Sequence, residues 1–186
     1  GHKNFVPHML GGASQADVGV LLIAARKGEF ETGFEKGGQT REHIQLAKTA
    51  GVKQLVVVIN KMDDPTVEWS EERYTECKKK LFPFLKASGF RPKKDCFWLP
   101  ISALGGINIG KDIPEGVCPW YDGKCLLTTL DELEPPERLL EYHVRMPITD
   151  KYNDMGVVVM GKLQAGLVKG GDKMTIAPID LKCTVR

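Results

Sequence analysis

The sequence is short of the features that mark membrane, secreted and zinc-binding proteins. No apolar run approaches the roughly 18 residues that a membrane-spanning helix needs, and no signal-peptide pattern is present. The five cysteines are an odd number without Cys-x-x-Cys spacing, and the histidines at 8, 43 and 143 lie far apart without ligand spacing. These absences exclude a disulfide framework and a zinc site. They favour a reducing compartment, and we expect the protein to be cytoplasmic.

Length and charge set further bounds. With 186 residues, the chain can hold one well-cored domain and part of a second. Charged residues make up 27% and the formal net charge is +2, a balance that neither requires nor excludes a nucleic-acid partner. The chain begins with Gly1 rather than Met, and its last residues stop within an apparent strand. We therefore expect it to be a segment of a longer protein.

One apolar run ends abruptly in polar residues. The run at 55–59 shows no polar alternation and stops at Asn60-Lys61-Met62-Asp63, as a buried parallel strand does when it delivers a site at its carboxyl end. Asn-Lys-x-Asp is the pattern that reads guanine in GTP-binding proteins. The Asp63 carboxylate can accept hydrogen bonds from the ring N–H and the exocyclic amine of guanine together, whereas adenine presents an acceptor in place of that N–H. A site of this kind rejects the wrong base by roughly 10⁴-fold.

The other two residues of the pattern have supporting roles. The aliphatic stem of Lys61 can cover one face of the base. The Asn60 amide can bond the purine or brace the neighbouring loops. The sequence therefore predicts a guanine site at the end of this strand, and the alternative is an ordinary polar turn.

Two further apolar runs have the same character. Residues 18–25 form a continuous run, which predicts a strand inside a sheet that is covered on both faces. Residues 96–101 form the next, and polar or small residues follow it at 102–106. Strands alternating with helices predict an α/β fold, a doubly wound parallel sheet built from right-handed crossovers.

Helices are predicted between these strands. One spans 39–50 and ends before Gly51, and another spans 70–87, beginning at Ser70. Pro83 should kink or split the second helix near Leu81. A short helix is predicted at 126–133. The segment 26–38 contains four glycines and is predicted to be a surface loop that serves contacts.

A second domain follows the Pro135-Pro136 pair. Beyond it the pattern changes to short alternating stretches separated by turns, which predicts an all-β domain too short to close a barrel alone. The predicted domains are residues 1–137 and 138–186, with strands at 142–148, 156–163 and 173–177.

The motifs together resemble the translation-factor GTPases of the elongation factor 1 alpha type. Gly1-His2-Lys3-Asn4-Phe5 is similar to the end of that family's Asp-x-Pro-Gly-His motif, and Ser102-Ala103-Leu104 to its last nucleotide loop. The resemblance covers essentially the whole chain. It implies a P-loop-type GTPase domain lacking its N-terminal part, followed by the beginning of a β-barrel domain.

The resemblance implies roles for individual residues. His2 would orient the attacking water, and the backbone N–H of Gly1 would bond the γ-phosphate; GTP hydrolysis depends mainly on such positioning and on charge stabilisation. The loop at Ser102, Ala103 and Leu104 would contact guanine, with a backbone N–H near Ala103 bonding the guanine oxygen. The implied cofactors are GTP or GDP and Mg²⁺, with the magnesium ligands upstream of this segment.

The sequence lacks one part that hydrolysis needs. No Gly-x-x-x-x-Gly-Lys-Ser/Thr loop is present, so the cradle of backbone N–H groups for the phosphates is missing. We therefore expect GTPase activity in a longer parent protein and none in this segment alone. A non-enzymatic scaffold, which binds guanine nucleotide or docks on the ribosome, is the alternative.

Several stretches are similar to the branch of the family that acts in translation termination. They include Gly11-Gly12-Ala13-Ser14-Gln15-Ala16-Asp17, the segment 25–43 and the segment 62–69. The implied partners are the stop-codon-decoding class I release factor and the ribosome, with no membrane and no DNA. Elongation factor 1 alpha itself and a ribosome-rescue paralogue remain alternatives.

Two surface features have competing interpretations. The basic stretches 78–80 and 91–94 could touch ribosomal RNA, but no aromatic residues are interleaved for stacking, so a solvated helix face is favoured. The Trp120-Tyr121 pair could belong to the core or could rest against the second domain.

Overall fold

The computed structural model describes residues 11–35, 37–135 and 137–186. Within them the chain forms two compact units, and the boundary follows Pro135. The first unit is mixed α/β and the second contains only strands. None of the helices in these described stretches has both the length and the apolar character needed to cross a membrane.

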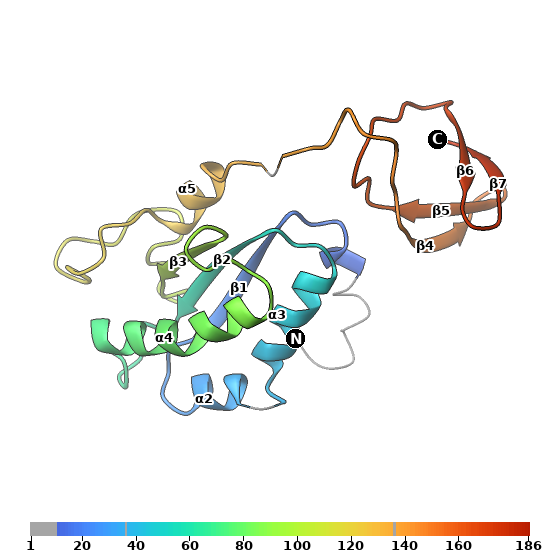
Figure 1. The fold of residues 1–186 in the computed structure, drawn as a ribbon. Coiled ribbons are helices and arrows are strands. Elements are labelled where there is room, and N and C mark those ends of the chain that lie inside the picture. The colour runs from blue at the N-terminus through green and yellow to red at the C-terminus, as the bar shows by residue number, and fades with distance from the viewer. Residues whose placement is uncertain (1–10, 36, 136) are drawn as a thin grey trace. The chain divides into compact units, whose positions relative to one another are not determined.

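A three-stranded parallel sheet forms the centre of the first unit. Its order is β1 (Val18–Ala24), β2 (Gln54–Asn60) and β3 (Cys96–Pro100), with β2 in the middle (Figure 1). The register pairs Ala24 with Asn60 and Ile59 with Pro100. The carboxyl ends of all three strands therefore lie at one edge, which confirms the predicted α/β class and parallel sheet.

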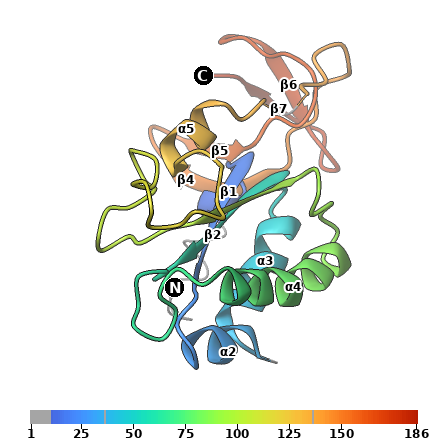
Figure 2. The ribbon, with the colours of Figure 1, turned by 90° about the vertical axis from the view of Figure 1, so that its left-hand side faces the viewer.

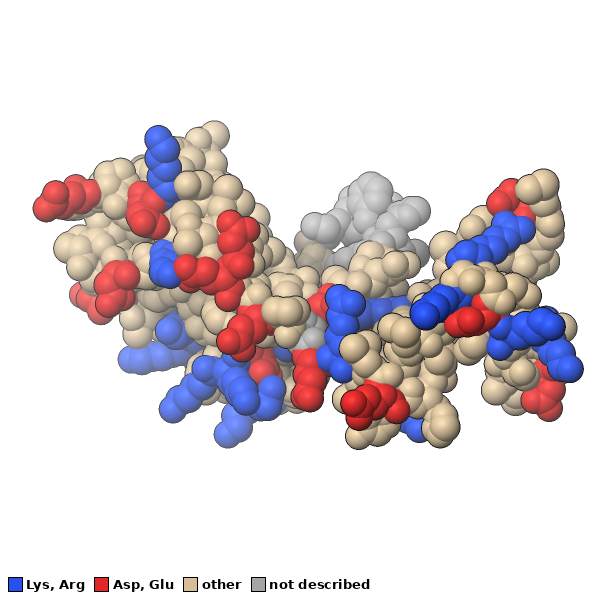
Figure 3. All heavy atoms as spheres, turned by 90° about the horizontal axis from the view of Figure 1, so that it is seen from above, with Lys and Arg blue, Asp and Glu red and all other residues tan. Residues whose placement is uncertain are grey.

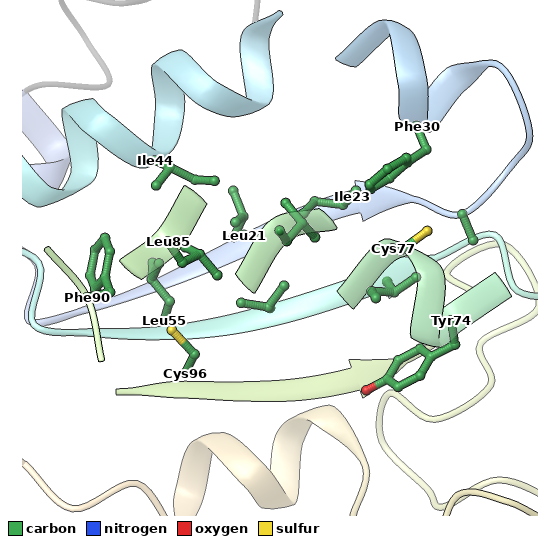
Figure 4. Packing of buried hydrophobic residues seen from close by; sticks show 14 of the residues in the cluster. Leu21, Ile23, Phe30, Ile44, Leu55, Tyr74, Cys77, Leu85, Phe90 and Cys96 are labelled. Carbon is green, nitrogen blue, oxygen red and sulfur yellow. The ribbon is translucent and has the colours of Figure 1, made fainter. Parts of the chain in front are cut away.

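Helices cover the two faces of this sheet (Figure 2). On one face lie α2 (Glu29–Phe34), α3 (Gln39–Thr49) and α4 (Glu71–Ala87), whose apolar residues pack with alternate residues of β1 and β2 (Figure 4). On the other face lies α5 (Leu126–Asp131), which packs with Val56 and Val58. Because β2 is buried on both faces, its five consecutive apolar residues are fully inside the unit: Leu55, Val56, Val57, Val58 and Ile59.

Strand β1 is fully covered on one face and only in part on the other, where Val18 packs with the second-face cluster. Leu21 and Ile23 are buried, whereas Val20 and Leu22 are 51% and 58% exposed. The prediction of a strand covered on both faces is therefore wrong for β1. The cause is its place at the edge of the three-stranded sheet, because the second-face cluster centres on β2 and β3.

Two local predictions for the first unit also need correction. The segment 26–38 is not simply a loop, because it contains α2, and Phe30 of this helix is 1% exposed. Pro83 does not split α4, which runs unbroken from Glu71 to Ala87. Proline removes one hydrogen bond to the residue four positions earlier, here Lys79. Both residues are exposed, so water can satisfy the freed carbonyl group.

The helix ends follow the sequence signals closely. Ser70 is the N-cap of α4, and its hydroxyl accepts a hydrogen bond from the Arg73 N–H at 3.2 Å. Gly51 and Gly89 follow α3 and α4 with φ angles of 95° and 91°, the left-handed conformation in which glycine is favoured. These predicted boundaries are confirmed.

The second unit consists of two antiparallel hairpins. One pairs β4 (Ile148–Asn153) with β5 (Val157–Gly161), and the other pairs β6 (Lys173–Ile176) with β7 (Leu181–Thr184). The strand predicted at 142–148 is wrong, because the hairpin strand begins at Ile148, after Pro147. All residues of β4 are exposed, so its sequence lacks the alternation of apolar and polar residues from which a strand is predicted. That this unit begins a larger barrel stays a prediction.

Candidate nucleotide-binding site

The predicted guanine-reading residues lie at the carboxyl edge of the sheet. Asn60 is the last residue of β2, and its Oδ1 accepts a hydrogen bond from the backbone N–H of Ala103 at 2.8 Å. The N–H of Met62 donates to the carbonyl of Ile101 at 3.1 Å. Two loops that are 43 residues apart in sequence are thus joined through one side chain and one backbone hydrogen bond.

The loop after β3 is braced by Ser102. This residue is fully buried, and its N–H and carbonyl both pair with Ile107, at 3.2 and 3.0 Å. Its Oγ also accepts a hydrogen bond from the Gly105 N–H at 3.1 Å. The structure therefore gives Ser102 a positioning role and leaves Ala103 and the fully exposed Leu104 at the tip of the loop.

The backbone N–H groups of this tip differ in their partners. The Ala103 N–H, which the resemblance assigns to the guanine oxygen, donates to Asn60. Within the described parts of the chain, the Leu104 N–H makes no backbone hydrogen bond. The assignment of one particular N–H to guanine therefore stays a prediction.

Lys61 has an unusual backbone and a defined side-chain partner. Its φ angle is 62°, a left-handed conformation that residues other than glycine seldom adopt. Its Nζ lies 2.7 Å from each carboxylate oxygen of Glu29, the first residue of α2. Both side chains are a little under half exposed, at 43% and 45%. The ammonium group is thus held at the surface beside the site.

The adjacent carboxylates of Asp63 and Asp64 have different surroundings. Asp64 accepts hydrogen bonds from the hydroxyl and N–H of Thr66 at 2.7 and 2.9 Å and pairs with Arg26 at 3.3 Å. The Thr66 hydroxyl, more than any other group, holds the pKa of Asp64 below its usual range. Asp63 is exposed, and among the described residues its carboxylate has neither a hydrogen bond nor an ion pair. Asp63 therefore keeps its full capacity to accept hydrogen bonds.

The loop that carries Asp63 is closed at its base. The Trp69 N–H donates to the Met62 carbonyl at 2.7 Å, and the Trp69 carbonyl accepts from the indole N–H of Trp120 at 2.7 Å. Trp120 also packs against Tyr74 of α4, with ring centroids 5.0 Å apart. The aromatic pair at 120 and 121 thus belongs to the first unit, and Trp120 fixes this loop.

Sequence reasoning missed a buried arginine behind the site. Arg73 of α4 is 6% exposed, and its Nε donates to the Ala25 carbonyl, just after β1, at 2.8 Å. Its Nη1 lies 2.9 Å from Glu31 of α2 and 2.7 Å from Glu76. The pKa of Glu31 is lowered from 4.5 to about 2, chiefly by the hydrogen bond from Arg73 and also by backbone hydrogen bonds such as that from the Gly28 N–H. Arg73 therefore ties α2 to α4 and to the end of β1.

Two predicted residues cannot be placed. Gly1 and His2, expected at the γ-phosphate and the attacking water, lie outside the described residues, and their roles stay predictions. Within the described stretches, no group of three or more His, Cys, Asp or Glu side chains could hold a metal ion.

The basic stretches on α4 and after it make contacts within the first unit. Lys78 lies over the Trp98 ring at 5.3 Å, Lys80 pairs with Glu76 at 2.7 Å, and Arg91 pairs with Asp95 at 2.7 Å. Acidic and basic side chains also lie close together on the face drawn in Figure 3. These contacts favour the interpretation as a solvated helix face.

Comparison with known proteins gives a consistent family assignment. Residues 1–144 match the family described as the elongation factor Tu GTP binding domain. The chain is 51% identical over 178 residues to a eukaryotic peptide chain release factor GTP-binding subunit from Zygosaccharomyces rouxii, covering 96% of this chain and 27% of that relative. It is 51% identical over 181 residues to the subunit of the same name from Schizosaccharomyces pombe, covering 97% of this chain and 27% of that relative.

Solved structures agree with these matches. A crystal structure of Sup35 complexed with GDP is 50% identical and has a TM-score of 0.65, covering 92% of this chain and 42% of that one. The chain thus spans about a quarter of the length of the two relatives, at 27%.

Proposed function

The chain belongs to the elongation factor Tu GTP-binding domain family, and we propose that it forms the guanine-reading part of a GTPase that acts in translation termination. Asp63 recognises the guanine edge, Lys61 covers the base, and Asn60 holds the loop of Ser102, Ala103 and Leu104 beside it. Termination as the process is supported by the likeness to release factor subunits at about half identity.

One observation carries the site assignment: the hydrogen bond of 2.8 Å between Asn60 Oδ1 and the Ala103 N–H. It brings the two motifs that sequence reasoning assigned to guanine into one place. Because β2 is buried on both faces and lies in register with β1 and β3, this edge is preorganised before any ligand binds. A preorganised edge, with a carboxylate at Asp63 that has no partner among the described residues, suits recognition of a base that presents two adjacent donors.

The activity of the whole protein forms the wider proposal. The complete protein binds GTP and GDP with Mg²⁺ and hydrolyses GTP on the ribosome, with His2 orienting water and Gly1 contacting the γ-phosphate. Its partner is the stop-codon-decoding class I release factor, and it works in the cytoplasm. Residues 1–137 then form part of the GTP-binding domain, and residues 138–186 begin a β-barrel domain.

Replacing the Asp63 carboxylate by an amide tests this proposal. Asp63→Asn replaces two acceptor oxygens by one acceptor and one donor, so the new amide N–H faces a donor of guanine. GDP affinity in the complete natural protein should fall about 30-fold or more, since an unsatisfied buried donor costs about 2–3 kcal/mol. Xanthosine diphosphate, which carries an acceptor in place of the exocyclic amine, should gain affinity.

Calorimetric titration with GDP, ADP and xanthosine diphosphate measures the effect. Asp131→Asn is the matched control, because Asp131 is exposed at the end of α5, and it should leave all three affinities unchanged. Equal affinity of the natural protein for GDP and ADP, or an unchanged preference in the Asp63 variant, would refute the assignment.

A further inference from the structure

We propose that Glu29 is a positioning residue of the nucleotide site, which holds Lys61 in the place where its stem covers the guanine base. This inference rests on the proposed function, since it needs Lys61 to contact the base. Nothing in the guanine-reading pattern itself points to Glu29, which lies 32 residues before Lys61 in the sequence.

The geometry of the pair is specific. The Lys61 Nζ lies 2.7 Å from Oε1 and 2.7 Å from Oε2 of Glu29, so the ammonium group faces the carboxylate symmetrically. The left-handed backbone of Lys61, at φ 62°, is a strained conformation of the kind that gathers at ligand sites. The ion pair and the backbone together restrict both ends of this lysine.

Glu29 is itself held by the residues that follow it. Phe30 is 1% exposed within the core, which anchors α2 against α4. Glu31 pairs with the buried Arg73 at 2.9 Å, and its other carboxylate oxygen accepts from the Gly28 N–H at 2.7 Å. A glutamate with these two neighbours has a fixed backbone, so it can serve as an anchor for the Lys61 side chain.

The ion pair favours binding because it restricts the rotamers of the Lys61 side chain before the nucleotide arrives. A lysine side chain on a surface samples many rotamers, and ordering it when the ligand arrives weakens the affinity. The ion pair orders Lys61 before the nucleotide binds. Because both partners are nearly half exposed, the effect is that of a surface pair, about two- to fivefold in affinity.

Glu29 contacts Lys61, which the proposed function assigns to the base and not to the phosphates. The change in affinity should therefore be equal for GDP and for a non-hydrolysable GTP analogue. The preference for guanine over adenine should persist, because Asp63 carries it. These two expectations separate a positioning role from a general change in the charge of the protein.

The test is a double-mutant cycle on nucleotide affinity in the complete natural protein. Glu29→Gln should weaken GDP and the GTP analogue by the same factor, about two- to fivefold, and should lower the urea unfolding midpoint by no more than the loss of one surface ion pair. Lys61→Met keeps an aliphatic stem and removes the ammonium group. In that background Glu29→Gln should have no effect. Glu35→Gln, a neutralisation just after α2 that removes no contact to Lys61, is the control and should bind normally.

Four results would overturn the inference. They are unchanged nucleotide binding in Glu29→Gln, tighter binding in that variant, the same loss in the Lys61→Met background, and a loss confined to one of the two nucleotides. A natural protein that does not prefer GDP to ADP would refute the proposed function instead. If Asp63→Asn changes base preference while Glu29→Gln changes nothing, the proposed function stands and this inference fails alone.

Discussion

Replacing Arg73 by Met tests whether one buried guanidinium fastens α2 to the rest of the first unit. Methionine keeps much of the apolar stem and removes the charge and all the donors. The substitution leaves the Ala25 carbonyl without the Arg73 Nε at 2.8 Å, and Glu31 without the Nη1 at 2.9 Å. These losses act on the segment that carries Glu29.

The expected loss of stability follows from three contributions. An abandoned buried carbonyl costs about 1–3 kcal/mol. The ion pairs to Glu31 and Glu76 add about 0.2–1 kcal/mol each, because those side chains are 35% and 44% exposed. The variant recovers part of the lost stability. In the natural protein the Nη2 of Arg73 is buried without a hydrogen-bond partner among the described residues, and methionine removes this unfavourable group. The net loss should be about 1–3 kcal/mol.

Part of this loss should depend on pH. The pKa of Glu31 is lowered from 4.5 to about 2, and the hydrogen bond from Arg73 is the largest cause. A carboxyl group whose pKa is lower in the folded state stabilises the fold above its unfolded pKa, and this contribution disappears as the pH falls through the folded value. The difference between the natural protein and the variant should therefore shrink between pH 4.5 and pH 2. Because Glu31 is 35% exposed, we expect about 1 kcal/mol or less from this effect.

Urea unfolding followed by tryptophan fluorescence measures both effects. All three tryptophans of these 186 residues lie in the first unit, so in a protein of this length the signal reports on that unit. Lys79→Met, at an exposed position of the same helix, is the control and should change stability little. Unfolding midpoints that match the natural protein at neutral pH, or a difference that stays constant down to about pH 3, would contradict the reasoning.

Two further substitutions probe the contacts around the site. Asn60→Ala removes the acceptor for the Ala103 N–H, and amide exchange at Ala103 should speed up about fivefold, as expected for about 1 kcal/mol; unchanged exchange would show that this bond does not hold the loop. Trp120→Phe keeps a ring beside Tyr74 and loses the 2.7 Å bond to Trp69. It should destabilise the unit by about 1 kcal/mol, more than Trp98→Phe, whose indole contact is 3.5 Å long; equal losses would contradict this account.

The central sheet could be predicted because a buried strand consists of a continuous run of apolar residues in the sequence. The strand β2 is buried on both faces, so its apolar residues are continuous and end sharply at Asn60. The exposed strand β4 has no such run, and its predicted position was wrong. For β1 the sequence could not show that only one face is fully buried. Its residues on the other face, Val20 and Leu22, are apolar as well, although they are exposed.

The helix α2 could not be predicted for a different reason. Its segment is rich in glycine, which suggested a loop. The structure shows that these glycines serve the ends and the packing of the helix. Gly28 precedes α2 with a φ angle of 83°, and a Cβ on Gly38 would lie 2.3 Å from the Gly33 carbonyl oxygen. The glycines thus allow close approach around a helix that Phe30 anchors in the core.

The contacts that position the site could not be read from the motifs. Glu29 meets Lys61 and Glu31 meets Arg73 across 32 and 42 residues of sequence, and no local spacing relates them. They become neighbours only because β1 and β2 are parallel and in register, which places the segment after β1 beside the end of β2.

The same arrangement explains how two adjacent aspartates acquire different roles. Asp64 turns toward Thr66 within its own loop and toward Arg26, and the contact with Arg26 links the loop after β2 to the segment after β1. The fixed loop then presents Asp63, whose carboxylate meets no partner within the described chain. An exposed carboxylate on a rigid support loses little conformational freedom on binding, and its discrimination between bases is correspondingly sharp. Base selectivity at Asp63 should therefore depend on Asp64, although Asp64 itself need not touch the nucleotide.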